Sequence, residues 1–229
     1  MAGCGAACGT LPALLLLLVP ALLVVAGAWY FNGKRTRDLK RFSEASGCAF
    51  DPAAAGVPDI FALELPGLPR LAGVDLFNSV GAPAPAGCRA WFADARVRSG
   101  RAGAPDCAFF TFALFELQGR ALPAFSLRPE VFTDDLGGEN GEDIDLPAYE
   151  EFSGQYHLRA ADRMAAERLF VSLVEFLGPR PGWTIAGKGP HLLVYKPDTE
   201  APAGGYGEFV RASGELAAAF HARAPRQPA

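Results

Sequence analysis

The sequence lacks the local patterns that mark common catalytic and metal-binding sites. Its five cysteines include no C-x-x-C pair, and no His/Cys pair has the spacing of a zinc site. No Gly-x-Ser-x-Gly segment occurs, so the nucleophile turn of α/β-hydrolases is missing. The order of residues in the sequence does not exclude a catalytic triad that assembles in space from distant residues. The sequence therefore gives no evidence for catalysis, and we expect neither an enzyme nor a bound cofactor.

A basic excess is also missing. The chain has 21 basic and 25 acidic residues, for a net charge of −4. Nucleic-acid-binding domains carry a clustered surplus of Lys and Arg, so nucleic acid is excluded as a partner. The one basic cluster follows a long uncharged stretch and consists of Lys34, Arg35, Arg37, Lys40 and Arg41. We predict that these five side chains contact the anionic surface of a membrane.

No charged residue precedes Lys34, and residues 11–31 form an apolar run. As a helix, 21 residues extend about 31 Å, enough to cross the hydrocarbon core of a bilayer. We therefore predict a short tail over 1–10 and a transmembrane helix over 11–31. A cleaved signal peptide is disfavoured because residues 1–10 hold no basic side chain. The Lys and Arg residues that follow the run predict that the remaining domain lies in the cytoplasm.

The remaining chain predicts an α+β fold: an N-terminal transmembrane helix, then one domain with a largely antiparallel sheet covered by two helices. We expect a juxtamembrane helix over 32–47, the domain over 48–223 and a disordered tail over 224–229. Apolar periodicity places the covering helices at 162–177, capped by Asp162, and at 208–220. The best strand candidates are 89–97 and 108–117; the second is apolar on both faces and should be central.

The cysteines allow two interpretations that depend on the compartment. In a reducing cytoplasm Cys48, Cys88 and Cys107 are expected to be small buried side chains with free thiols. If the domain faced the other side of the membrane, Cys88 and Cys107 would be candidates for a disulfide between neighbouring strands.

An acidic, glycine-containing stretch runs from Thr133 to His157 without any Lys or Arg. Clustered carboxylates on a flexible backbone are typical ligands of hard divalent cations. Asp143, Asp145 and His157 are therefore the candidate metal ligands, although the register does not fit an EF-hand. The favoured interpretation is an acidic surface loop.

Four segments carry a resemblance to a known group of proteins. They are "LPAFSLRPE" (122–130), "DIDLPAYEEFSGQYHLR" (143–159), "ERLFVSLVEFLG" (167–178) and "HLLVYKP" (191–197). Behind a short N-terminal span, this combination resembles a family of uncharacterised bacterial single-pass membrane-anchored proteins, a domain of unknown function. The resemblance implies the architecture and a bacterial source, and it implies no activity. Together with the basic residues that follow the apolar run, it predicts a bacterial inner (plasma) membrane location with a cytoplasmic domain.

The functional hypothesis is a membrane-anchored, non-catalytic binding or interaction module. Its expected partners are the lipid bilayer and a protein whose identity the sequence does not give. The alternative is a metal-dependent hydrolase that uses the acidic loop 134–151. A weaker alternative is a lipid-contacting domain, which rests on fold analogy alone.

Overall fold

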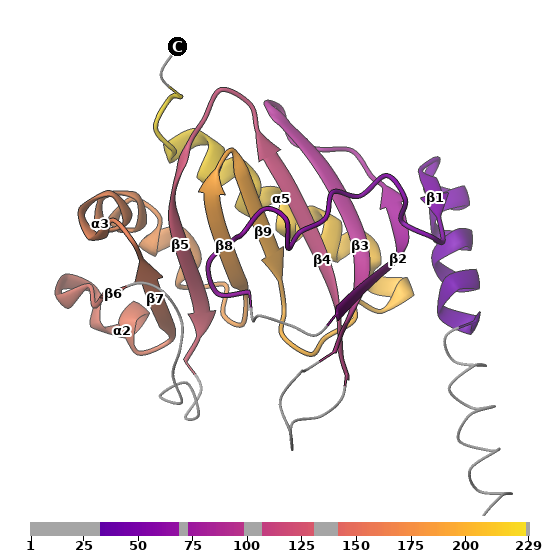
Figure 1. The fold of residues 1–229 in the computed structure, drawn as a ribbon, viewed down its shortest axis with the longest axis horizontal. Coiled ribbons are helices and arrows are strands. Elements are labelled where there is room, and N and C mark those ends of the chain that lie inside the picture. Colours follow the sequence, from indigo (N-terminus) through magenta and orange to yellow (C-terminus); the bar gives the residue numbers. More distant parts are fainter. Residues whose placement is uncertain (1–32, 69–72, 99–106, 131–141, 228–229) are drawn as a thin grey trace, which may run out of the picture.

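A single antiparallel sheet of nine strands forms the body of the molecule (Figure 1). The structure is a computed structural model that describes residues 33–68, 73–98, 107–130 and 142–227. The strand order is β1-β2-β3-β4-β9-β8-β5-β7-β6. The strands are β1 (Ala49–Asp51), β2 (Gly73–Gly81), β3 (Cys88–Arg98), β4 (Cys107–Leu117), β5 (Leu122–Pro129), β6 (Glu142–Asp143), β7 (Tyr156–Ala160), β8 (Thr184–Gly189) and β9 (His191–Tyr195).

Strand β4 lies in the interior of the sheet because both of its faces are apolar. It pairs with β3 over eleven positions and with β9 on its other side. Phe110, Phe112 and Leu114 belong to one hydrophobic core, whereas Ala113 and Phe115 belong to a second core across the sheet. The predicted strands 89–97 and 108–117 are therefore confirmed, and so is the central position of the second.

The two faces of the sheet are covered by different kinds of structure. Helix α5 (Tyr206–Arg223) packs across one face, where Phe125 stacks on Phe220 at 5.7 Å between ring centroids. The opposite face is crossed by residues 52–68, which form turns and bury Ile60 and Leu65 against the sheet (Figure 1). The helix α5 and the segment 52–68 thus enclose the sheet from either side.

The helix of residues 33–46, called the 33–46 helix below, packs against the edge of the α5 layer. Leu39 is fully buried, and the Phe42 ring lies 5.4 Å from the ring of Tyr206. The helix ends at Gly47, whose φ of +66° is the left-handed conformation that glycine adopts at low cost. A helix was predicted over 32–47, and the described residues show one over 33–46.

The predicted fold class needs correction. No helix in the described ranges is long and apolar enough to cross a membrane. The transmembrane helix that the sequence predicted over 11–31 lies outside the described residues. The covering of the sheet also differs from the two predicted helices, because five α-helices are described and an irregular segment covers one face. Over the described residues the fold is a nine-stranded antiparallel sheet with these helices.

The predicted helix 162–177 is two short helices, α3 (Arg163–Val171) and α4 (Val174–Leu177). Asp162 caps α3 as predicted, because its carboxylate accepts the Ala165 N–H. The break consists of Ser172 and Leu173, and the Ser172 hydroxyl donates to the Leu169 carbonyl at 2.6 Å. A further short helix, α2 (Glu150–Ser153), precedes β7.

The predicted disordered tail is also partly ordered. The Ala121 N–H donates to the Pro225 carbonyl, and the Gln227 N–H donates to the Gly119 carbonyl. Ala224 is buried. Residues 224–227 therefore pair with the turn that follows β4.

The alternative disulfide between Cys88 and Cys107 is excluded by the register of the β3–β4 hairpin. Cys88 lies opposite Leu117, and Cys107 lies opposite Arg98, at the other end of the ladder. Ten residue steps of roughly 3.3 Å separate the two positions by about 30 Å, whereas a disulfide needs Cα atoms within about 7 Å. Cys48 and Cys88 are free thiols.

We expect Gly187→Ala to destabilise the fold, because β8 passes directly over a core aromatic ring. A Cβ at position 187 would lie 2.8 Å from Cζ of Phe125, which is fully buried between Phe170 and Phe220. Overpacking of this kind costs about 1–3 kcal/mol. The free energy of unfolding in urea measures the loss.

Gly204→Ala is the matched control, since a Cβ there meets no heavy atom within 4 Å. A Gly187→Ala variant as stable as Gly204→Ala would show that β8 does not pack on Phe125 in this way.

Candidate functional site

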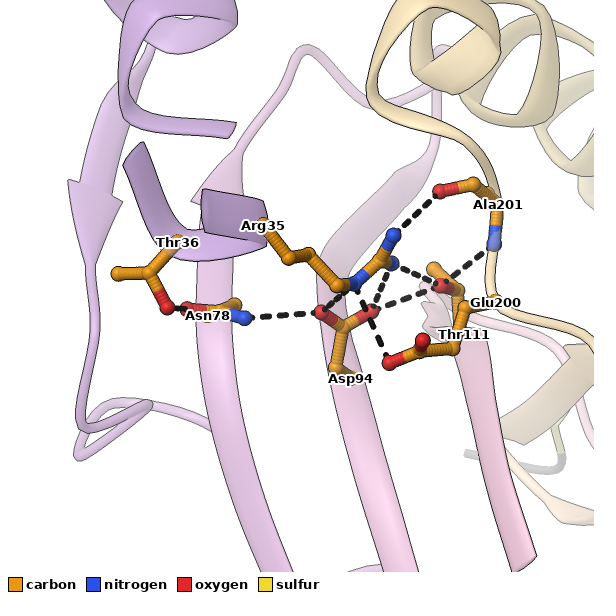
Figure 2. A network of polar contacts seen from close by, with 7 residues as sticks. All are labelled: Arg35, Thr36, Asn78, Asp94, Thr111, Glu200 and Ala201. Atoms are coloured by element: carbon orange, nitrogen blue, oxygen red, sulfur yellow. Dashed lines mark hydrogen bonds and ion pairs between the residues drawn. The ribbon is translucent and has the colours of Figure 1, made fainter. Parts of the chain in front are cut away.

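A buried carboxylate, Asp94 on β3, is the centre of the most extensive side-chain network in the described residues (Figure 2). Its side chain is 0% exposed. Arg35 donates to its two oxygens at 2.8 and 2.7 Å, Thr111 Oγ1 donates at 2.7 Å, and Asn78 Nδ2 donates at 3.0 Å. Four hydrogen bonds fill the four lone-pair sites of a carboxylate, so Asp94 is fully satisfied.

The strand alternation explains why Asp94 points away from the core of segment 52–68. Ala93 and Ala95 face that core, and Asp94 therefore faces the side of the 33–46 helix. Thr111 lies directly opposite Asp94 on β4. The side chain of Asn78, on β2, also accepts a hydrogen bond from Thr36 on the 33–46 helix at 2.9 Å.

Arg35 extends the network to the segment of residues 196–202, which connects β9 to α5. Its guanidinium donates to the Ala201 carbonyl at 2.9 Å and lies 3.2 Å from Glu200 Oε1. Thr111 Oγ1 accepts the Ala201 N–H at 2.9 Å, and the Thr111 N–H donates to the Thr199 carbonyl at 3.0 Å. The network therefore joins the 33–46 helix, three strands and segment 196–202.

The network favours the charged form of Arg35 and disfavours the charged form of Glu200. Burial alone would lower the pKa of Arg35, but its hydrogen bond and attraction to Asp94 prevail and raise it. Burial raises the pKa of Glu200; Arg35 opposes this effect, and Asp94 adds to it. A permanently charged guanidinium thus holds a saturated carboxylate. Such an arrangement leaves Asp94 no free oxygen with which to act as a base.

Tyr206 lies under this network with its hydroxyl buried and without a hydrogen-bond partner among the described residues. Burial raises the pKa of Tyr206, the negative charge of Asp94 raises it further, and Arg35 lowers it. Its ring contributes to an aromatic cluster with Phe42 and Phe209. The side chain therefore contributes apolar packing, and its hydroxyl carries a desolvation cost.

The structure corrects one of the five predicted membrane-contacting residues. Arg35 is only 14% exposed and is bound to Asp94, so it is not available to a lipid headgroup. Lys34, Arg37, Lys40 and Arg41 are exposed on the 33–46 helix. Contact of these four with a membrane surface stays a prediction.

Two of the three candidate metal ligands lie near each other. His157 Nε2 on β7 is 3.6 Å from Asp143 Oδ1 on β6, and Asp145 is exposed. Within the described parts of the chain, no group of three or more His, Cys, Asp or Glu residues is placed to hold a metal ion. The part of the acidic stretch over 133–141 lies outside the described residues. The predicted ligand set therefore does not assemble from Asp143, Asp145 and His157.

An apolar hollow of about 150 Å³ opens on the face that segment 52–68 crosses; sequence reasoning missed it. Residues from four stretches of the chain line it: Phe61, Leu68, Val97, Ala108, Phe110, Tyr195, Pro197 and Asp198. Phe110 and Tyr195 stack with 4.6 Å between ring centroids. Among the described residues of the lining, Asp198 is the one that carries a charge. It belongs to segment 196–202, which the Asp94 network holds.

Over the described residues, the domain thus combines an antiparallel sheet and helices with a fully hydrogen-bonded buried carboxylate and an apolar hollow. No protein-family model matches the chain, and no curated protein matches it. Among solved structures, the crystal structure of the mycobacterial trehalose monomycolate transport factor A, TtfA, is similar. The TM-score is 0.51 at 15% sequence identity, over 85% of this chain and 98% of that chain. At this identity the likeness concerns the fold alone. The resemblance to uncharacterised membrane-anchored proteins stays a prediction.

We expect Tyr206→Phe to raise the free energy of unfolding at pH 7 by about 1 kcal/mol, because it removes a buried hydroxyl that has no partner. Tyr156→Phe is the matched comparison: its hydroxyl donates to the Arg180 carbonyl at 2.7 Å, so the same change should cost about 1 kcal/mol. Urea unfolding of both variants measures the free energy of unfolding, which should rise in Tyr206→Phe and fall in Tyr156→Phe.

The difference in the free energy of unfolding between Tyr206→Phe and the unmodified chain should grow above pH 10. A tyrosine whose pKa is raised on folding contributes stability that is complete below its unfolded pKa of about 10 and is lost as pH rises beyond it. Equal losses in the two phenylalanine variants at pH 7 would contradict an unpartnered Tyr206 hydroxyl.

Proposed function

We propose that this chain is a non-catalytic module that binds a protein partner. The observation that carries the proposal is the apolar hollow, whose described lining consists of seven uncharged residues and one exposed carboxylate. Apolar hollows beside a few placed polar groups are the usual form of a recognition site.

The chemistry of the charged groups supports binding over catalysis. The buried carboxylate of Asp94 is saturated by Arg35, Thr111 and Asn78. A general base needs a free lone pair within reach of a substrate proton. The hydrolase alternative draws no support from Asp143, Asp145 and His157, since they form no ligand set in the part of the chain that the structure describes.

The size of the hollow supports a protein partner over a small-molecule substrate. Sites for drug-sized ligands and cofactors enclose roughly 300–1,000 Å³. The hollow, at about 150 Å³, is smaller than that range. It suits a single side chain that anchors a larger interface, the arrangement in which a few residues supply most of the binding energy.

A lipid-contacting role is the second candidate. Lys40 and Arg41 are 63% and 79% exposed on the 33–46 helix, and cations of this kind are attracted to anionic headgroups. TtfA, the similar solved structure, is described as a trehalose monomycolate transport factor. That description belongs to TtfA. The predicted location at the cytoplasmic face of the bacterial inner membrane stays a prediction.

Site-specific photocrosslinking in living cells tests both candidates. A photoreactive p-benzoylphenylalanine replaces Phe61 at the hollow, Lys40 on the 33–46 helix, or Ala218, which is exposed on α5 and serves as the control. We expect a discrete protein adduct from position 61 and none from position 218. Gel shift and mass spectrometry identify the adducts.

A lipid adduct from position 40 without any protein adduct would favour the second candidate and contradict the first. A protein adduct from position 40 alone would preserve the binding module and move its interface away from the hollow. The absence of adducts from positions 40 and 61 would contradict both candidates.

A further inference from the structure

We propose that the hollow receives one apolar side chain of a partner protein, of about the size of an aromatic ring, with a basic residue next to it. This inference rests on the proposed binding function and names the chemistry of the partner. Three observations carry it: the shape and lining of the hollow, its volume, and the carboxylate at its rim.

The lining is built for an apolar group. Phe110 and Tyr195 provide stacked rings from β4 and β9. Val97 and Ala108 come from the facing ends of β3 and β4, where they are paired in the ladder. Residues 61 and 68 of the crossing segment, together with Pro197, complete the lining. The hollow is partly open, so an inserted aliphatic or aromatic side chain would bury one part of its apolar surface against these residues. Such burial is the main source of affinity at a site of this kind.

The volume selects a group of limited size. An apolar cavity of about 150 Å³ holds a ligand as large as benzene. The hollow has about that volume, so a phenylalanine or leucine side chain fills it and a bicyclic cofactor does not fit.

The charge at the rim selects the neighbour of that side chain. Asp198 is exposed and has a φ of +47°, a left-handed conformation that is uncommon outside glycine and that aspartate tolerates better than most residues. No ion pair joins Asp198 to another charged residue in the described ranges. The carboxylate of Asp198, beside the apolar hollow, complements the charge of a Lys or Arg that follows the inserted side chain in the partner.

The rim is held in place before a partner arrives. The Thr199 carbonyl accepts from the Thr111 N–H, and the Ala201 N–H donates to the Thr111 hydroxyl, so segment 196–202 is fixed to β4 on the C-terminal side of Asp198. A preformed rim reduces the ordering that binding requires.

Capped dipeptides test the proposed chemistry on the full chain. N-acetylated, C-amidated Phe-Lys, Phe-Glu and Ala-Lys are titrated while amide chemical shifts are followed by NMR. We expect Phe-Lys to shift residues around Phe110 and Asp198 and to bind more tightly than Phe-Glu by roughly two- to fivefold, the range for an exposed ion pair. Ala-Lys should not bind measurably.

Two variants, each with a matched control, test whether the hollow and Asp198 bind the peptide. Ala108→Leu fills the hollow and should weaken Phe-Lys binding by about tenfold or more, whereas Ala218→Leu adds the same atoms on exposed α5 and should leave it unchanged. Asp198→Asn should abolish the preference for Phe-Lys over Phe-Glu, and Glu208→Gln on α5 should preserve it. Thermal unfolding confirms that each variant is folded.

Equal affinity for Phe-Lys and Phe-Glu in the unmodified chain would overturn the basic-residue part of the proposal. If folded Ala108→Leu bound Phe-Lys as tightly as the unmodified chain does, the hollow would not be the binding site of the Phe side chain. If neither Phe peptide binds while photocrosslinking still yields a protein adduct from position 40, the chemistry proposed here is wrong and the binding module itself stands.

Discussion

The buried contact between Arg35 and Asp94 is the constraint on which the arrangement of the molecule depends. A carboxylate that is 0% exposed is stable only when its charge is compensated and its lone pairs are filled. Here a guanidinium 59 residues away in the sequence supplies the charge, and Thr111 and Asn78 fill the remaining positions. Because the partners come from separate elements, Asp94 is satisfied only when the 33–46 helix, β2, β3 and β4 are all in place.

The same contact reaches the candidate binding surface. Arg35 and Thr111 both bind Ala201, and Thr111 also binds Thr199, so the segment that carries Asp198 is fixed by the residues that satisfy Asp94. A well-packed apolar replacement of a buried ion pair is often as stable as the pair itself. The contribution of the pair is therefore best understood as specificity: it selects one position for the helix and for segment 196–202.

The parts of the fold that sequence reasoning predicted are those encoded locally. The apolar residues on both faces of β4 place it in the sheet interior, and Asp162 marks the start of its helix. The network could not be predicted, because Asp94 is the one acid in a strand that also holds three arginines, and nothing in the sequence pairs it with Arg35. The basic run containing Arg35 looks like a uniformly solvated face, and only the fold shows that one of its members is buried. The hollow combines four separate stretches, and the cover over one face is an irregular segment without periodicity.

A double-mutant cycle tests most directly whether the Arg35–Asp94 pair is a structural constraint. The free energy of unfolding is measured in urea for the unmodified chain, Arg35→Met, Asp94→Leu and the double variant. The account predicts that each single variant loses about 3–5 kcal/mol, because an uncompensated polar group or charge stays buried. The double variant should lose clearly less than the sum of the two losses. Single variants within about 0.5 kcal/mol of the unmodified chain, the range of ordinary surface changes, would contradict the account.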